Sequence, residues 1–185
     1  GHSLGGKAAI RLAETRPDAV STLIVADVSP FEAPDAVCEG IRSIADAILT
    51  TDLSAASSRT EAEEILSPKL GSKNIARFLL QNAERREDGS GYLWKDGTRV
   101  AAGSIDEVCG PTAARSTEPL WNGPVLLIRG GDSPHFPDSD LEDFLVLFPG
   151  TEEKTIPGAG HWLHISAAGE FAGIVSAFLD RIDSR

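Results

Sequence analysis

The sequence predicts an α/β fold, in which a parallel sheet with flanking helices is interrupted by a mostly helical insertion. Two short apolar runs, each followed by turn residues, have the composition of strands buried on both faces of a parallel sheet, and a weaker third strand is predicted after them. Segments with helical periodicity alternate with these runs, as is typical of such sheets. The 185 residues suffice for one core. A net charge of −11 argues against a nucleic-acid partner, which requires clustered Lys and Arg.

The chain opens with GHSLG at residues 1–5, a G-x-S-x-G pattern. This spacing is typical of a serine, here Ser3, on a sharp turn between a strand and a helix, where larger neighbouring side chains would collide. Residues 4–16 are expected to form the helix and to end before Pro17. The expected strand would lie upstream of residue 1, so we predict an N-terminally truncated chain whose isolated form is insoluble or inactive.

The later elements follow from apolar runs and from periodicity. The predicted strands are residues 22–26, 124–128 and 153–156. The last segment repeats apolar residues at helical spacing, which predicts a helix with one buried face. The residues of that face are Phe171, Ile174, Val175, Phe178, Leu179 and Ile182.

An insertion of about ninety residues separates the first two strands, far more than an ordinary crossover needs. We interpret residues 31–118 as a helical cap over the catalytic edge of the sheet, and residues 1–30 and 119–185 as the core domain. The helices expected in the cap, and an extended segment after a turn, fall at residues 37–49, 62–66, 75–80 and 92–94.

A serine nucleophile requires a positioned base, and histidine has a suitable pKa near neutral pH. His161 follows the third predicted strand, at the sheet edge where functional loops gather. A carboxylate must orient that imidazole. Asp27 ends the first predicted strand, and Asp132 follows the second, beside Ser133. Both aspartates are candidates on position alone.

Four segments, GHSLGGKAA, VADVSP, RGGDSP and PGAGHW, resemble the serine branch of the α/β-hydrolase family, particularly its small bacterial esterases. In many members the acid occupies the last position of G-x-x-D after the next-to-last strand, and Ser133 occupies that position here. In a subset the acid follows the strand after the nucleophile, which matches Asp27. The resemblance therefore favours Asp27 as the acid, with Ser133 as an auxiliary hydrogen-bond partner and Asp132 as the alternative.

The same resemblance implies a partial α/β-hydrolase fold and cleavage of a small carboxylic ester or thioester through an acyl-serine, without a cofactor. It implies that the backbone N–H of Leu4 is one oxyanion donor. Trp94 and Trp162 are candidates for contact with the substrate. Two alternatives stay open, a carbon–carbon bond hydrolase of the same fold and a catalytically inactive binding protein.

Cysteine usage and hydropathy exclude several classes of site. Cys38 and Cys109 are isolated, without a C-x-x-C or a His pair at ligand spacing, so we expect no metal site. We interpret both as reduced, buried thiols of a cytoplasmic protein, with a disulfide between them as the alternative. No run reaches the roughly 18 apolar residues of a membrane span, and we expect no membrane partner. The oligomeric state is left open.

Overall fold

The computed structural model describes residues 1–184, and contacts divide the chain into two compact units. The first consists of Gly1–Pro34 and the segment from Gly110 onward, and the second is Asp35–Cys109. These limits are narrower than the predicted insertion because Phe31 and Ala113 are buried in the core of the first unit. In the described part of the chain, no helix has the length and apolarity needed to cross a membrane.

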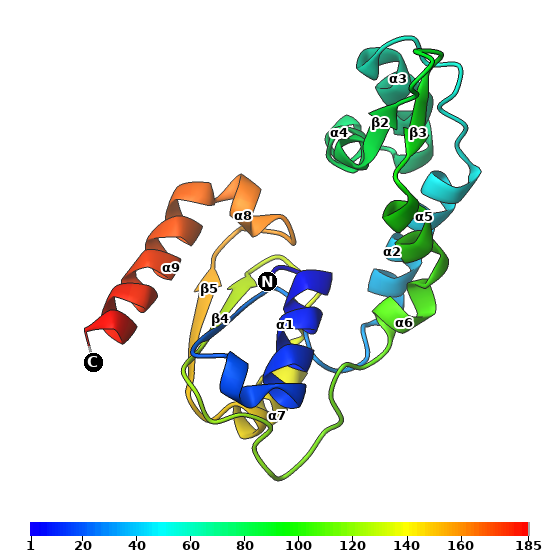
Figure 1. Cartoon of the computed structure of the whole chain (residues 1–185). Helices are drawn as coiled ribbons and strands as arrows, with labels where there is room; N and C mark the ends of the chain where they lie inside the picture. The colour runs from blue at the N-terminus through cyan, green and yellow to red at the C-terminus, as the bar shows by residue number, and fades with distance from the viewer. Residues whose placement is uncertain (185) are drawn as a thin grey trace. The chain divides into compact units, whose positions relative to one another are not determined.

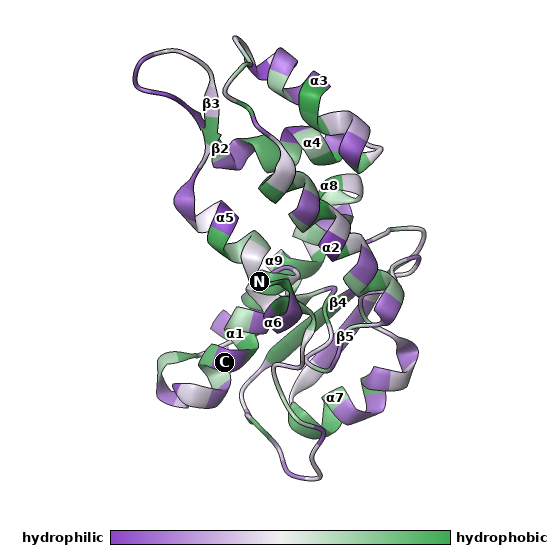
Figure 2. Ribbon diagram, turned by 90° about the vertical axis from the view of Figure 1, so that its right-hand side faces the viewer, coloured by the Kyte–Doolittle hydropathy of each residue, from purple (hydrophilic) through white to green (hydrophobic). Residues whose placement is uncertain are grey.

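The sheet of the first unit has three parallel strands in the order β1-β4-β5 (Figure 1). They are β1 (Leu23–Ala26), β4 (Val125–Gly130) and β5 (Thr151–Ile156), which confirms the three predicted strands. The central strand β4 is almost entirely buried, and Figure 2 shows it in hydrophobic colours, whereas β5 is largely hydrophilic. The hydropathy of each strand therefore reflects whether the strand is central or at the edge of the sheet.

Helices cover both faces of this sheet, because successive side chains of a strand point to opposite sides. Val125 and Leu127 of β4 belong to the core beneath α1 (Leu4–Thr15) and α7 (Leu141–Leu147). Leu126 and Ile128 belong to the core beneath the C-terminal helices (Figure 1). These are α8 (Leu163–Ser166) and α9 (Ala168–Asp183), and the short helices η1 (Pro17–Ala19) and η3 (Asp138–Asp140) complete the unit.

Helix α9 packs through the predicted stripe with one exception. Its residues Phe171, Ile174, Val175, Phe178 and Ile182 contact the sheet core. Leu179 is instead 39% exposed. The stripe is thus one residue narrower than the periodicity suggests, and the chain has a solvent-facing leucine at this position.

The first three residues run beside β1 as a further parallel row. His2 forms a parallel bridge with Ala26, and the N–H of Ala26 donates to the carbonyl of Gly1 at 2.9 Å. The N–H of Ser3 donates in turn to the carbonyl of Ala26 at 3.1 Å. The chain therefore passes from strand pairing directly into α1 at Ser3, which is the local context that the G-x-S-x-G pattern predicts.

The second unit has its own core, centred on side chains such as Leu66, Leu80 and Trp94. Its helices correspond to the periodic segments of the sequence, and the hairpin strand Ala83–Arg85 and the last two helices were not predicted. The elements are α2 (Asp35–Thr50), α3 (Arg59–Leu70), α4 (Lys73–Leu79), η2 (Leu80–Asn82), β2 (Ala83–Arg85), β3 (Tyr92–Trp94), α5 (Asp96–Gly103) and α6 (Ile105–Cys109). Cys38 and Cys109 are both buried thiols here.

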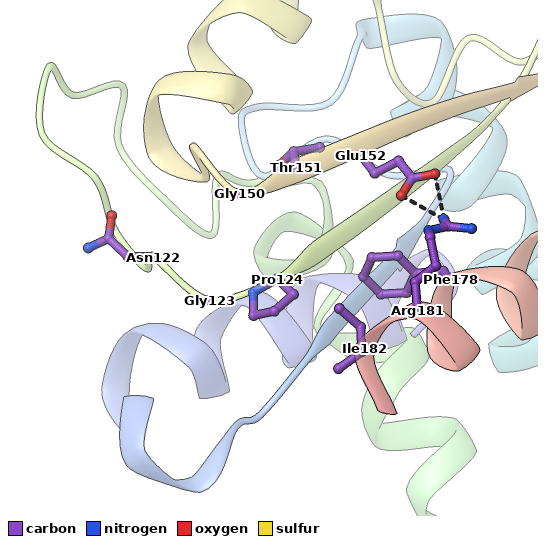
Figure 3. Close-up of a pocket in the computed structure, with 9 residues that line it drawn as sticks. All are labelled: Asn122, Gly123, Pro124, Gly150, Thr151, Glu152, Phe178, Arg181 and Ile182. Atoms are coloured by element: carbon purple, nitrogen blue, oxygen red, sulfur yellow. Dashed lines mark hydrogen bonds and ion pairs between the residues drawn. The ribbon is translucent and has the colours of Figure 1, made fainter. Parts of the chain in front are cut away.

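A cavity of about 330 Å³ lies at the amino ends of β4 and β5, next to α9 (Figure 3). Arg181 reaches across it and donates to both carboxylate oxygens of Glu152 at 2.7 Å. The carboxyl ends of the same strands carry the candidate site described next. The cavity and the site are therefore at opposite edges of the sheet.

Candidate functional site

Ser3 has the strained backbone expected of a nucleophile at a sharp turn. Its φ is 52° and its ψ is −124°, and helix α1 begins at the next residue. Among residues 1–184, Ser3 and Asp27 are the two non-glycine residues with positive φ. Such strain persists only where the surrounding structure imposes it, and it concentrates at functional sites. Both residues were predicted from the sequence as members of one site.

The glycines around Ser3 differ in what they contribute. A Cβ atom on Gly1 would lie 2.1 Å from the carbonyl oxygen of Gly5, and one on Gly6 would lie 2.6 Å from the Val28 side chain. A Cβ atom on Gly5 would meet nothing within 4 Å. The steric need for glycine therefore applies to Gly1 and Gly6 and is absent at Gly5.

Asp27 is the carboxylate that the structure brings to His161. Asp27 is fully buried, and its Oδ2 lies 2.8 Å from His161 Nδ1. Ser133 Oγ donates to the same oxygen, and the N–H of Gly130 donates to Oδ1 at 2.9 Å. Asp132 is exposed and takes no part in this network. Ser133 thus hydrogen-bonds the Asp27 carboxylate, and Asp27 hydrogen-bonds the His161 imidazole.

These contacts set the ionisation of Asp27. Burial alone would raise the pKa of its carboxyl, because the charged form loses hydration. Hydrogen bonds from His161, Ser133 and the Gly130 N–H outweigh burial, so the pKa lies below its usual value of 3.8. Asp27 is therefore a buried anion at neutral pH. An anion beside Nδ1 favours the tautomer in which Nδ1 carries hydrogen and Nε2 carries a lone pair.

Three further histidines surround His161. The ring of His135 stacks on it with centroids 3.4 Å apart and planes 10° apart, and the ring of His2 lies at 4.5 Å. His2 Nε2 donates to the carbonyl of His161 at 2.8 Å, and His164 lies 4.3 Å from His2. Burial, the largest cause, lowers the pKa of both His2 and His135 to about 4. These two rings are therefore neutral around His161.

Ser3 joins this group through its neighbour in sequence. His2 connects directly to the backbone of His161, which brings the end of the first strand-like segment to the loop after β5. Within residues 1–184, no hydrogen bond links the Ser3 hydroxyl to the His161 imidazole. Hydrogen bonds of a catalytic site are often long before substrate binds.

The remaining predicted residues occupy two different environments. The N–H of Leu4 is at the first position of α1, where a helix leaves its amides without intrahelical partners. Trp162 is half-buried with its ring 6.0 Å from that of His161. Trp94 is 4% exposed and lies in the core of the second unit. Among residues 1–184, no three His, Cys, Asp or Glu side chains are grouped to hold a metal ion.

Sequence reasoning missed the histidines that flank His161. His135 lies in a proline-flanked loop and His2 adjoins the nucleophile, and neither position predicts a contact with His161. The available signal was positional, because His135 follows Ser133 by two residues on the loop after β4. In an irregular loop, the sequence does not predict the direction of a side chain two residues beyond a known site residue. Its stacking on His161 required the three-dimensional structure.

Comparison with known proteins places this geometry in a family. The profile of the alpha/beta hydrolase family matches residues 1–174. The chain is 32% identical over 181 residues to the sn-1-specific diacylglycerol lipase ABHD11 of Mus musculus, covering 97% of this chain and 57% of that protein. It is 29% identical over 164 residues to Esterase YbfF of Escherichia coli strain K12, covering 89% of this chain and 59% of that protein.

A solved structure described as a marine microorganism esterase superposes with a TM-score of 0.86 at 33% identity, covering 96% of this chain and 68% of that one. The chain spans little more than half the length of the curated relatives described above. Both the profile match and the shared fold extend over the core and the inserted unit alike. This chain belongs to the alpha/beta hydrolase family.

Proposed function

We propose that the protein is a serine hydrolase that cleaves carboxylic esters or thioesters through an acyl-enzyme on Ser3. The observation that carries the proposal is the buried Asp27–His161 hydrogen bond of 2.8 Å beside the strained Ser3 turn. The lipase and the esterases to which the chain is similar support an ester as substrate. His161 acts as the base, Asp27 as the acid and Ser133 as the auxiliary partner of Asp27.

The proposed proton path starts at the Ser3 hydroxyl. His161 Nε2 accepts that proton as Ser3 Oγ attacks the acyl carbon, and the resulting imidazolium is stabilised by the Asp27 carboxylate. The imidazolium then gives the proton to the leaving alcohol or thiol, whose bond to the acyl carbon breaks. Water repeats the sequence in the second half: it loses a proton to His161, attacks the acyl-serine and releases the carboxylic acid and the free Ser3 hydroxyl.

The N–H of Leu4 is the proposed donor to the oxyanion of the tetrahedral intermediate. It lies at the start of α1, where the helix dipole also favours negative charge. Trp162, 6.0 Å from the His161 ring, is the proposed contact for the substrate. Trp94 is not proposed for this role, because it is buried among the side chains of its own unit.

The inserted unit is the proposed substrate-selecting cap. Two observations support its treatment as a separate element: it has its own core, and the N–H of Thr112 donates to the carbonyl of Pro30 at 2.7 Å. That bond joins the chain before the insertion to the chain after it.

A cytoplasmic location stays a prediction from the sequence.

The proposal is tested by labelling the whole natural protein with a fluorophosphonate and by assaying p-nitrophenyl esters. We expect labelling that is lost in Ser3→Ala, and a fall in kcat of about 10⁴-fold in Asp27→Asn, because the imidazole loses its anion and its tautomer. Asp132→Asn is the matched control and should stay within about 3-fold of wild type. Loss of turnover in Asp132→Asn with Asp27→Asn intact would refute the assignment of the acid.

The same assays separate the alternatives. A folded protein without any labelling would indicate a non-catalytic binding protein. Faster turnover of a diketone than of the esters would indicate carbon–carbon bond hydrolysis by the same residues. Comparison of a diacylglycerol with a short p-nitrophenyl ester would then define the acyl and alcohol preferences.

A further inference from the structure

The His161 ring is stacked on another imidazole. The rings of His135 and His161 are 3.4 Å apart between centroids and nearly parallel. This separation equals ordinary van der Waals contact, so His135 covers one face of the His161 ring. The function proposed above gives His135 no role, either in the triad or beside Ser133.

The backbone of His135 is fixed from two loops. Its N–H donates to Ser133 Oγ at 3.3 Å, and its carbonyl accepts from the N–H of Ser29 at 3.2 Å. Ser133 also donates to Asp27. One short loop after β4 therefore supports both the carboxylate and the imidazole of the pair.

This arrangement supplies a restraint that Asp27 alone does not. A single hydrogen bond fixes the position of His161 Nδ1 but leaves the tilt of the ring free to vary. A flat side chain pressed against one face limits that tilt, and the direction of Nε2 with it. Small errors in the direction of a catalytic group reduce rate steeply.

The charge of His135 suits the role. Burial and the neighbouring His161 lower the pKa of His135 to about 4, so the ring is neutral near pH 7. A neutral aromatic face attracts a cation placed over it. His135 therefore opposes neither the neutral nor the protonated form of His161.

We propose that His135 is a positioning residue, whose flat ring sets the plane of the His161 imidazole for proton transfer to and from Ser3. This inference rests on the function proposed above. It assigns to His135 an effect on kcat and none on the affinity for substrate.

Variants at position 135 of the whole natural protein test the proposal. His135→Phe and His135→Tyr keep a flat ring, whereas His135→Leu has similar bulk without one. We expect the aromatic variants to keep kcat within about 3-fold of wild type. We expect His135→Leu to lose about 10-fold in kcat, with KM within about 2-fold and a parallel slowing of fluorophosphonate labelling at Ser3. Circular dichroism and Tm identify the variants that fold.

Ser139→Leu is the control, because Ser139 is exposed in η3, the short helix that follows the loop of His135. It should leave kcat within about 2-fold of wild type. A rise in KM at constant kcat in His135→Leu would overturn the proposal in favour of a substrate contact. Equal loss in a folded aromatic variant and in His135→Leu would overturn it as well. A wild-type protein without labelling would instead refute the proposed function.

Discussion

At the scale of single residues, the site depends on two backbone conformations that side chains disfavour. Ser3 and Asp27 both have a φ of 52°, and each follows a row of parallel sheet pairing at its carboxyl end. A residue in such a conformation costs on the order of 1–3 kcal/mol of folding free energy. The fold tolerates this cost at the two positions that carry the proposed nucleophile and acid.

Replacement of Ser3 tests this strain directly. Ser3→Gly should raise the free energy of unfolding by about 1 kcal/mol relative to Ser3→Ala, because glycine adopts positive φ without a clash. Both variants lack the hydroxyl, so the comparison isolates the backbone. Urea unfolding of the whole natural protein measures the difference. Equal stability of the two variants would show that the turn is relaxed.

At the scale of elements, helix α1 is anchored by a buried cation. Lys7 is 7% exposed, and its Nζ donates to the carbonyl of Gly110 at 2.6 Å. Gly110 is the first residue of the core after the inserted unit. The helix that follows Ser3 therefore holds the returning chain in place. Hydrogen bonds from charged groups typically contribute about 1.5–3 kcal/mol.

Lys7→Met keeps the length of the side chain and removes the donor. We expect a loss of about 1–3 kcal/mol in the free energy of unfolding, because the half-buried Gly110 carbonyl loses its charged partner. Lys69→Met is the control, since the Lys69 Nζ donates to the Thr50 carbonyl at 3.0 Å on an exposed surface. The control should change stability by less than about 0.5 kcal/mol. Similar losses in both variants, measured by denaturant unfolding, would contradict the anchoring role.

The elements also show what the sequence could reveal. The buried strand β4 was predictable because all its neighbours are protein, so its residues are apolar almost without interruption. Helix α7 (Leu141–Leu147) was not predicted. Its seven residues are too few for a clear helical period, and their apolar content also suits a strand.

The site was predictable to the extent that its residues sit at strand ends. The rule that functional loops gather at the carboxyl edge of a parallel sheet placed His161, Asp27 and Asp132 there, and the family resemblance favoured Asp27 over Asp132. Their mutual hydrogen bond joins residues 134 positions apart, and no local pattern encodes such a distance. The stacking of His135 depends on the path of one loop, which sequence periodicity does not describe.

At the scale of the whole molecule, stability should depend on pH through the neutral histidines. His2 and His135 have pKa values lowered to about 4 in the folded state, from an ordinary value of 6.5. Between these values the unfolded chain binds protons that the folded chain does not. Acid therefore favours unfolding across this window. Asp27, whose pKa is also lowered, adds a further loss of stability as the pH falls below about 3.8.

Tm measured from pH 8 to pH 4.5 should fall as the pH drops below about 6.5. The double variant with His2→Gln and His135→Phe should show a shallower fall, because two groups no longer titrate between the folded and unfolded states. The aspartates and the other two histidines remain in both proteins. Identical slopes for the variant and the wild type would show that these rings are not held neutral by folding.

Strand β5 has one more consequence for the molecule. In the described sheet it has a neighbour only on its β4 side, and it carries the charged side chains Glu152, Glu153 and Lys154. The unpaired backbone groups of an edge strand can form hydrogen bonds with a strand of another molecule, which leads to aggregation. Charged side chains on the edge strand disfavour this pairing. The hydrophilic composition that made β5 the least obvious strand is thus also a safeguard against aggregation.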